Sequence, residues 1–184
     1  TAWLFGDSTA ADQGRISLNP LVHLDLWGTL ALFLCGFGWA KPVPYDRGNL
    51  QAAHPRWVRW TELGVAAAGP VSNLLLAGVL RLALELKSWI PPGTQDVFCV
   101  MIVSGVVINI GLFLFNLIPI FPLDGFTVLR NALPLDAALV FQRTQAYGTY
   151  LLLGYFLLAR AMEFSVLGPA PGFLLEHLYR LRLA

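Results

Sequence analysis

The sequence predicts an all-α polytopic membrane protein with a small β-hairpin element near the N-terminus and about three to four membrane segments. Hydrophobic residues make up 57% of the 184-residue chain and charged residues only 12%, whereas soluble domains carry about 25% charged residues. No charged residue occurs between Val97 and Leu123. The net charge of +1 gives no electrostatic basis for binding nucleic acid, so we expect membrane lipid as the environment.

The N-terminal part is expected to lie at the membrane surface, apart from one short membrane segment. Residues 1–25 are predicted to hold a surface strand or hairpin, because Ile16 and Leu18 alternate with polar residues. The uncharged run 26–40 is shorter than the roughly 20 residues of a straight span, so we expect a short, tilted or broken membrane segment. Residues 41–60 are expected to form an interfacial loop, because prolines, arginines and tryptophans gather there.

The remaining chain is predicted to be helical. Residues 61–87 are expected to form a membrane helix whose first half is rich in small residues, which let another helix approach closely. Residues 97–121 give the clearest membrane helix, and 144–160 are expected to form another. Residues 173–183 have the pattern of an interfacial helix. Without internal repeats or low-complexity segments, residues 1–184 are predicted to be a single membrane domain.

Asp124 is the most informative single residue. It ends the long uncharged run and lies between Pro122 and Gly125. A carboxylate at mid-bilayer depth costs on the order of 3 kcal/mol, so it is expected to have a partner or a chemical role. One interpretation is a metal ligand or proton carrier. The other is an N-cap for a helix that begins near Phe126, since aspartate is a favoured cap.

The other polar residues in apolar runs carry weaker signals. Asn73 is expected either to hydrogen-bond the backbone of a substrate in the membrane or to join two helices, which is the commoner role of an intramembrane asparagine. Asn109 and Asn116 are expected to join helices. None of the three histidines (His23, His54 and His177) belongs to an H-E-x-x-H motif. His23 and Asp25 would share one face of a strand, but a structural hydrogen bond is the favoured role for this histidine.

Short sequence blocks occur in a characteristic order, and each block alone is weak. In chain order they are Gly6–Ala10, Gly14–Leu21, His23–Asp25, Gly28–Thr29, Phe37–Pro44, Ala68–Asn73, Phe115–Pro119 and Pro122–Gly125. In these blocks the chain resembles the site-2 protease family of intramembrane zinc metalloproteases, in its short bacterial form. The resemblance extends from Gly6 to about Arg130.

The resemblance implies a zinc site and a substrate site. Family members hold zinc with two histidines of an H-E-x-x-H helix and one aspartate, which here is Asp124. Gly69, Pro70 and Asn73 match the segment that binds an extended substrate. The H-E-x-x-H motif, with its general-base glutamate, is absent from this chain and is expected upstream of Thr1. No catalytic residue beyond the metal ligand is therefore assigned within the chain.

The resemblance predicts an intramembrane zinc metalloprotease that cleaves membrane-embedded peptide segments, located in the bacterial cytoplasmic membrane. The alternative is a catalytically inactive relative that acts as a structural membrane subunit of a larger complex. A small transporter or channel is disfavoured, because few ionisable groups line a path and no inverted repeat is present.

Overall fold

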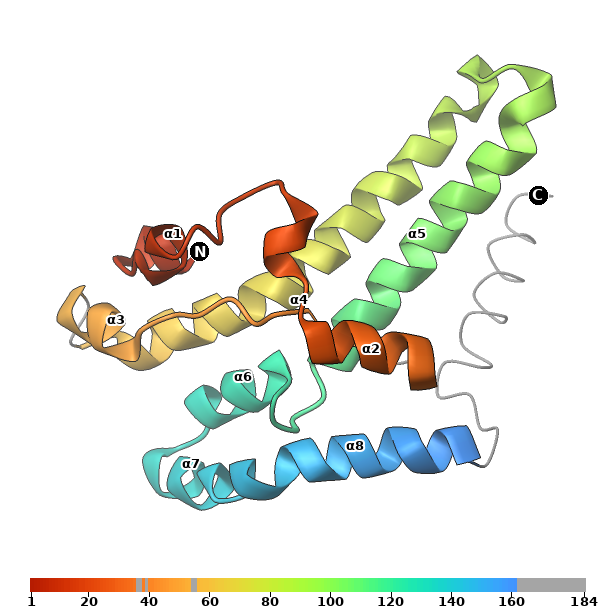
Figure 1. Ribbon diagram of the computed structural model, residues 1–184. Coiled ribbons are helices and arrows are strands. Elements are labelled where there is room, and N and C mark those ends of the chain that lie inside the picture. The colour runs from red at the N-terminus through yellow and green to blue at the C-terminus, as the bar shows by residue number, and fades with distance from the viewer. Residues whose placement is uncertain (36–37, 39, 54–55, 162–184) are drawn as a thin grey trace.

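The fold is built on two long helices that pack side by side in opposite directions. The computed structural model describes residues 1–35, 38, 40–53 and 56–161. Helix α4 (Val58–Ala83) and helix α5 (Gln95–Asn116) form a helical hairpin, which runs diagonally across the view in Figure 1. They are joined by the short 3-10 helices η3 (Leu84–Trp89) and η4 (Pro92–Thr94).

Both helices of this hairpin are apolar on most of their surface. The segments Val58–Trp89 and Pro92–Asn116 are long and apolar enough to cross a membrane, and only 17% and 11% of their most apolar windows are buried. The core helix of a soluble protein would be mostly buried. Outward-facing leucine, valine and methionine side chains instead give this hairpin a surface suited to lipid, which indicates a membrane protein.

The structure corrects the expected number of membrane segments. Among the described residues, two helices meet the length and hydropathy needed for a span, instead of three or four. Helix α2 (Leu26–Cys35) has 10 residues and helix α8 (Gln145–Ala161) has 17. At about 1.5 Å per residue, the described parts of these helices are about 15 Å and 26 Å long, shorter than the roughly 30 Å hydrocarbon layer.

The expected β-hairpin near the N-terminus is wrong. The described part of the chain contains no strand, and its β-structure is a single bridge between Leu24 and Ala40. Asn19 accepts a hydrogen bond from the amide of Leu21, and Pro20 follows it, so a 3-10 helix begins directly after the alternating residues. Alternation alone did not make a strand, because Leu18 is fully exposed and has no neighbouring strand to pack with.

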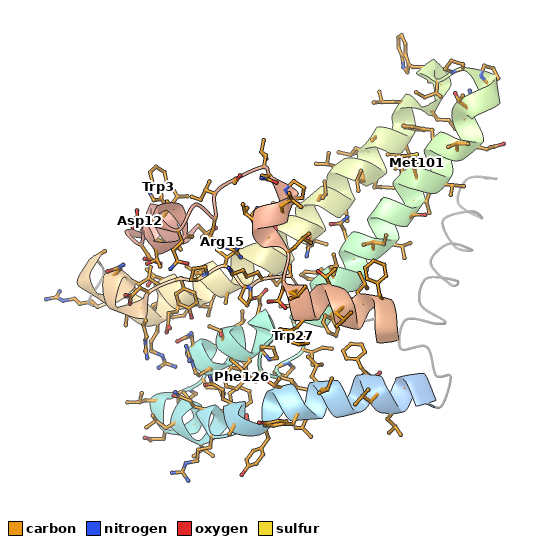
Figure 2. The ribbon with its side chains drawn as sticks, viewed as in Figure 1. Trp3, Asp12, Arg15, Trp27, Met101 and Phe126 are labelled. Carbon is orange, nitrogen blue, oxygen red and sulfur yellow. The ribbon has the colours of Figure 1, made fainter. Side chains whose placement is uncertain are left out.

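The N-terminal region consists of short helical turns that pack around the first half of α4. They are η1 (Ala2–Phe5), α1 (Thr9–Asp12), η2 (Pro20–His23), α2 and α3 (Arg47–Ala53). Arg15 is buried and donates hydrogen bonds to the carbonyls of Val22, Lys41 and Pro42, which holds the proline-rich segment in place. Figure 2 labels Arg15 beside this segment.

Several element boundaries differ from those expected. The segment 41–60 was expected to be a loop, but it contains α3, and α4 begins at Val58. Helix α5 ends at Asn116, before the first proline of the following loop. The expected interfacial helix 173–183, with His177, lies outside the described residues, as does His54. That residues 1–184 form a single domain stays a prediction.

After α5 the chain turns back beneath α4. Helices α6 (Asp124–Ala132) and α7 (Leu135–Gln142) lie below the first half of α4 in Figure 1, and α8 follows them. Phe126 of α6 is buried, stacks on Phe141 at a centroid distance of 4.8 Å and meets Phe121 edge-on at 5.8 Å; Figure 2 labels it. A Cβ atom on Gly125 would lie 2.3 Å from the Leu117 carbonyl oxygen, so only glycine fits there. These contacts fix the start of α6.

Candidate active site

Two motifs that are distant in the sequence meet in the structure. A Cβ atom on Gly69 of α4 would lie 3.0 Å from Oδ2 of Asp124 on α6. The carboxylate of Asp124 therefore lies directly against the backbone of α4. This approach depends on the absence of a side chain at position 69. The structure thus brings together the predicted metal ligand and the first residue of the predicted substrate-binding segment.

The carboxylate of Asp124 has no protein partner in the described ranges. Helix α6 begins at Asp124 itself, Leu123 is its N-cap, and no side chain caps this helix end. The alternative expectation, that Asp124 caps a helix beginning near Phe126, is therefore wrong. The carboxylate is half-buried, and this burial raises the pKa of the Asp124 carboxyl above its usual value. Because no described protein group bonds to this carboxylate, its oxygens are available to bind a cation.

Pro70 and Asn73 follow Gly69 in α4. Pro70 is buried within the helix and has no N–H to donate to the carbonyl of Ala66. Asn73 lies one helical turn beyond Gly69, so the two share a face of α4 with the Asp124 carboxylate beside it. Asn73 is half-buried, and its amide makes no hydrogen bond to another residue that the structure describes. An unbonded amide on this face is suited to bind a peptide backbone.

The other two intramembrane asparagines behave differently. Asn109 donates to the carbonyl of Gly105 at 2.8 Å, and Asn116 donates to the carbonyl of Leu112 at 2.9 Å. Each amide group therefore bonds to its own helix one turn back instead of joining two helices as expected. Asn73 differs from both because its amide has no such bond.

His23 and Asp25 have structural roles. The Nε2 atom of His23 lies 2.8 Å from the Ser17 carbonyl oxygen, as the favoured interpretation expected. The carboxylate of Asp25 accepts a hydrogen bond from the amide of Gly28 at the start of α2. The two side chains serve different local contacts and do not form a ligand pair.

Asp124 is a single carboxylate of the kind that binds metal ions, and the other ligands of a metal site are not found beside it in the described ranges. Among residues 1–35, 38, 40–53 and 56–161, no three His, Cys, Asp or Glu side chains gather to form a metal site. A catalytic zinc ion needs three protein ligands and an open position. The unpartnered carboxylate fits one of these ligands, and the described chain does not supply the others.

Sequence reasoning missed a buried charge cluster next to this site. Glu62 is only 2% exposed, and Arg130 of α6 donates to both of its carboxylate oxygens at 3.2 Å. Arg47 also contacts it at 3.3 Å, and Arg59 donates to carbonyls at the end of α6. The sequence placed Arg47 and Arg59 in a loop exposed to lipid headgroups. The feature of the sequence that could have revealed this cluster is Glu62, the sole acidic residue of α4.

Asp7 anchors the N-terminal segment to α3. It is 1% exposed and accepts hydrogen bonds from the side chains of Thr9 and Asn49 and from the amide of Asp46. Burial by itself would raise its pKa, but the hydrogen bonds from Asn49, Thr9 and the backbone lower the pKa of Asp7 to about 2. The carboxylate is therefore a charged structural group.

These features define a class of protein: a helical membrane protein with an unpartnered carboxylate held against a Gly-Pro segment of a neighbouring helix. The chain is 37% identical over 155 residues to a Bacillus subtilis protein named "Putative zinc metalloprotease YwhC". It is 32% identical over 135 residues to a Mycolicibacterium smegmatis protein named "Putative zinc metalloprotease Rip2". The chain belongs to the site-2 protease family, whose zinc chemistry these names imply.

The matched regions cover most of this chain but less of the relatives. They take up 80% and 71% of the chain, and 67% and 49% of the lengths of the two relatives. No protein-family profile matches the chain, and no solved structure matches it. The family assignment therefore rests on these two relatives.

Proposed function

We propose that this chain is part of an intramembrane zinc metalloprotease that cleaves membrane-embedded peptide segments in the bacterial cytoplasmic membrane. The observation that carries this proposal is the Asp124 carboxylate, which lies against Gly69 and is not used as a helix cap. The names of the two relatives support the zinc chemistry. The apolar α4–α5 hairpin supports the membrane location.

Asp124 is proposed to bind zinc together with two histidines of an H-E-x-x-H helix from a part of the gene product outside this sequence. When bound, zinc would supply a water molecule of lowered pKa and polarise the scissile carbonyl. The residues of this chain would orient the substrate. Asn73 would hydrogen-bond the substrate backbone, and Gly69 would let that backbone approach the carboxylate.

A membrane-embedded substrate needs polar groups near its cleavage site, and we propose that this face of α4 provides them. A peptide segment must leave its helical conformation before a protease can reach its carbonyl groups. In a bilayer, each backbone group exposed by unwinding costs several kcal/mol unless a polar partner is present. The amide of Asn73, together with the half-buried carboxylate beside it, provides polar groups within an otherwise apolar surface.

The test uses the complete gene product, purified in detergent and assayed with a membrane-segment peptide. We expect about one zinc ion per chain. Asp124→Ala should lose the zinc and lower the cleavage rate by roughly 100-fold or more, because one ligand is removed. The matched control is Asp136→Asn, since Asp136 is an exposed acidic residue in the first turn of α7. Full cleavage by Asp124→Ala would contradict the proposal.

The same measurement decides the alternative of an inactive relative that serves as a structural subunit. The specific observation behind this alternative is the lack of a three-ligand cluster in the described residues. A complete gene product that lacks H-E-x-x-H, contains no zinc and co-purifies with other membrane proteins at fixed stoichiometry would favour the subunit.

A further inference from the structure

We propose that the buried ion pair between Glu62 and Arg130 is a positioning device that holds Asp124 against Gly69. Its effect on zinc rests on the proposed function, whereas its effect on geometry does not. Neither residue is placed in contact with metal or substrate. Both would act through the placement of α6, so they are positioning residues.

The ion pair joins the second turn of α4 to the last turn of α6. The Nη2 atom of Arg130 lies 3.2 Å from both carboxylate oxygens of Glu62, and the side chains are 16% and 2% exposed. Arg47 contacts the same carboxylate at 3.3 Å from its more exposed position. The buried charge of Glu62 is therefore paired on two sides, as a buried carboxylate requires.

A second polar contact attaches the same end of α6. Arg59 lies three residues before Glu62, so both side chains project from one face of α4. Its guanidinium donates to the carbonyl of Arg130 at 3.2 Å and to the carbonyl of Leu133. These carbonyls belong to the C-terminal end of α6, where a positive charge also interacts favourably with the helix dipole. The end of α6 is thus held by directional bonds from two neighbouring residues of α4.

The two contact points lie at similar spacing along both helices. Six residues separate Asp124 from Arg130 on α6, a rise of about 9 Å, and seven separate Glu62 from Gly69 on α4, a rise of about 10.5 Å. Since Glu62 meets Arg130 while Gly69 meets Asp124, the helices run antiparallel and in register. The ion pair at one end therefore sets which residue of α4 faces Asp124 at the other.

Apolar packing alone does not set this register as strictly. Hydrophobic contacts are non-directional, so a short helix held by them can shift along its neighbour at small cost. A buried ion pair leaves unpaired charges after such a shift, which makes it a register-determining contact. Gly125 and Phe126 hold the start of α6 against the preceding loop and α7, whereas the ion pair acts directly between α6 and α4.

The geometric test is a cysteine cross-link in the complete protein. Gly69→Cys and Asp124→Cys are combined in a background with Cys35→Ala and Cys99→Ala, and the rate of oxidative cross-linking is measured. The Cβ position at residue 69 lies 4.0 Å from Cγ of Asp124, a separation that a disulfide can bridge with small adjustments. We expect Glu62→Gln or Arg130→Gln to slow cross-linking by roughly tenfold.

The matched control is Arg81→Gln. Arg81 forms an exposed ion pair with Glu85 at the other end of α4, at 2.9 Å. Its loss should leave the cross-linking rate within about twofold. If Glu62→Gln does not accumulate as folded protein, Arg130→Lys takes its place, because lysine keeps the charge but cannot contact both carboxylate oxygens in a fork. Unchanged cross-linking in the folded variant would overturn the proposal.

The second test measures zinc in the protein with its natural Asp124 and Gly69. We expect Glu62→Gln to weaken zinc binding roughly tenfold while the helical circular dichroism stays unchanged. The charge-reversed pair Glu62→Arg with Arg130→Glu should recover part of this loss. Slower cross-linking in a protein that binds no zinc would sustain the positioning role and reject the proposed function. Normal cross-linking in Glu62→Gln, in a protein that binds zinc, would sustain the proposed function and reject the positioning role.

Discussion

The two ends of α4 show how one continuous helix is adapted to two environments. Its first half is covered by α3, α6 and the N-terminal turns, and it carries the buried ion pair of Glu62 with Arg130. Its second half contacts α5 and leaves apolar side chains exposed, with Arg81 and Glu85 paired in the open. The buried ion pair therefore lies in the protein-covered half, and the exposed apolar side chains suited to lipid lie in the other half.

The largest loss of stability is expected from a substitution in the protein-covered half of α4. Glu62→Ala leaves Arg130 buried without its partner, and breaking a buried pair costs about 3–5 kcal/mol. The measurement is the free energy of unfolding of the detergent-solubilised protein. A loss below about 1 kcal/mol would contradict the contrast between the two ends, because that is the range of an exposed pair.

A smaller effect is expected where the N-terminal segment docks on α3. Asp7→Asn should cost about 2 kcal/mol, because the charge-assisted hydrogen bonds that the buried Asp7 carboxylate accepts are weakened. The pKa of Asp7 is about 2 in the folded state and 3.8 ordinarily. The stability it contributes is fully present above pH 3.8 and is lost as the pH falls towards 2.

The check on Asp7 is an acid titration of stability. The unfolding free energy of the parent protein should fall more steeply than that of Asp7→Asn between pH 4 and about 2, so the two curves converge. Parallel curves over this range would show that Asp7 does not carry the acid dependence.

Two glycines of α4 test the difference between its two halves, because replacing either one with alanine adds a single methyl group. Gly78 lies in the lipid-facing half, and a Cβ atom there would meet nothing within 4 Å. Gly78→Ala should therefore stabilise the protein by about 0.5–1 kcal/mol, because alanine favours the helix. Gly69→Ala gains the same helix propensity but presses on the Asp124 carboxylate, so zinc affinity should fall roughly tenfold.

The measurements for this pair are thermal stability and zinc content. Equal zinc affinity in both variants would contradict the close approach of Asp124 to α4. A loss of stability in Gly78→Ala would show that another part of the protein covers that half of the helix.

The smallest effect is expected at the exposed ion pair. Arg81→Ala should change the unfolding free energy by about 0.5 kcal/mol or less, since exposed pairs at this helical spacing contribute little. High salt should weaken even this contribution. A change above about 1 kcal/mol would place Arg81 in a covered environment and remove the contrast.

Much of the helical framework could be predicted from the sequence. Continuous apolar runs identified α4 and α5, because a membrane helix needs only length and hydropathy. The hairpin at Ile16 and Leu18 failed, because a strand needs a partner that lies elsewhere in the chain. The extra membrane segments are not supported, because the described parts of α2 and α8 have 10 and 17 residues, fewer than a span needs.

The sequence by itself determined the composition of the membrane hairpin, the presence of Asn73 within it and the presence of Asp124 shortly after it. It also carried the family resemblance, since ordered motifs are a property of the chain. Only the tertiary structure decided that Asp124 lies against Gly69 without capping its helix, and that Glu62 pairs with Arg130. The physical reason is the distance along the chain over which each interaction acts. Apolar runs and helix propensity act between near neighbours in the chain. A buried charge is paired only by residues that folding brings beside it.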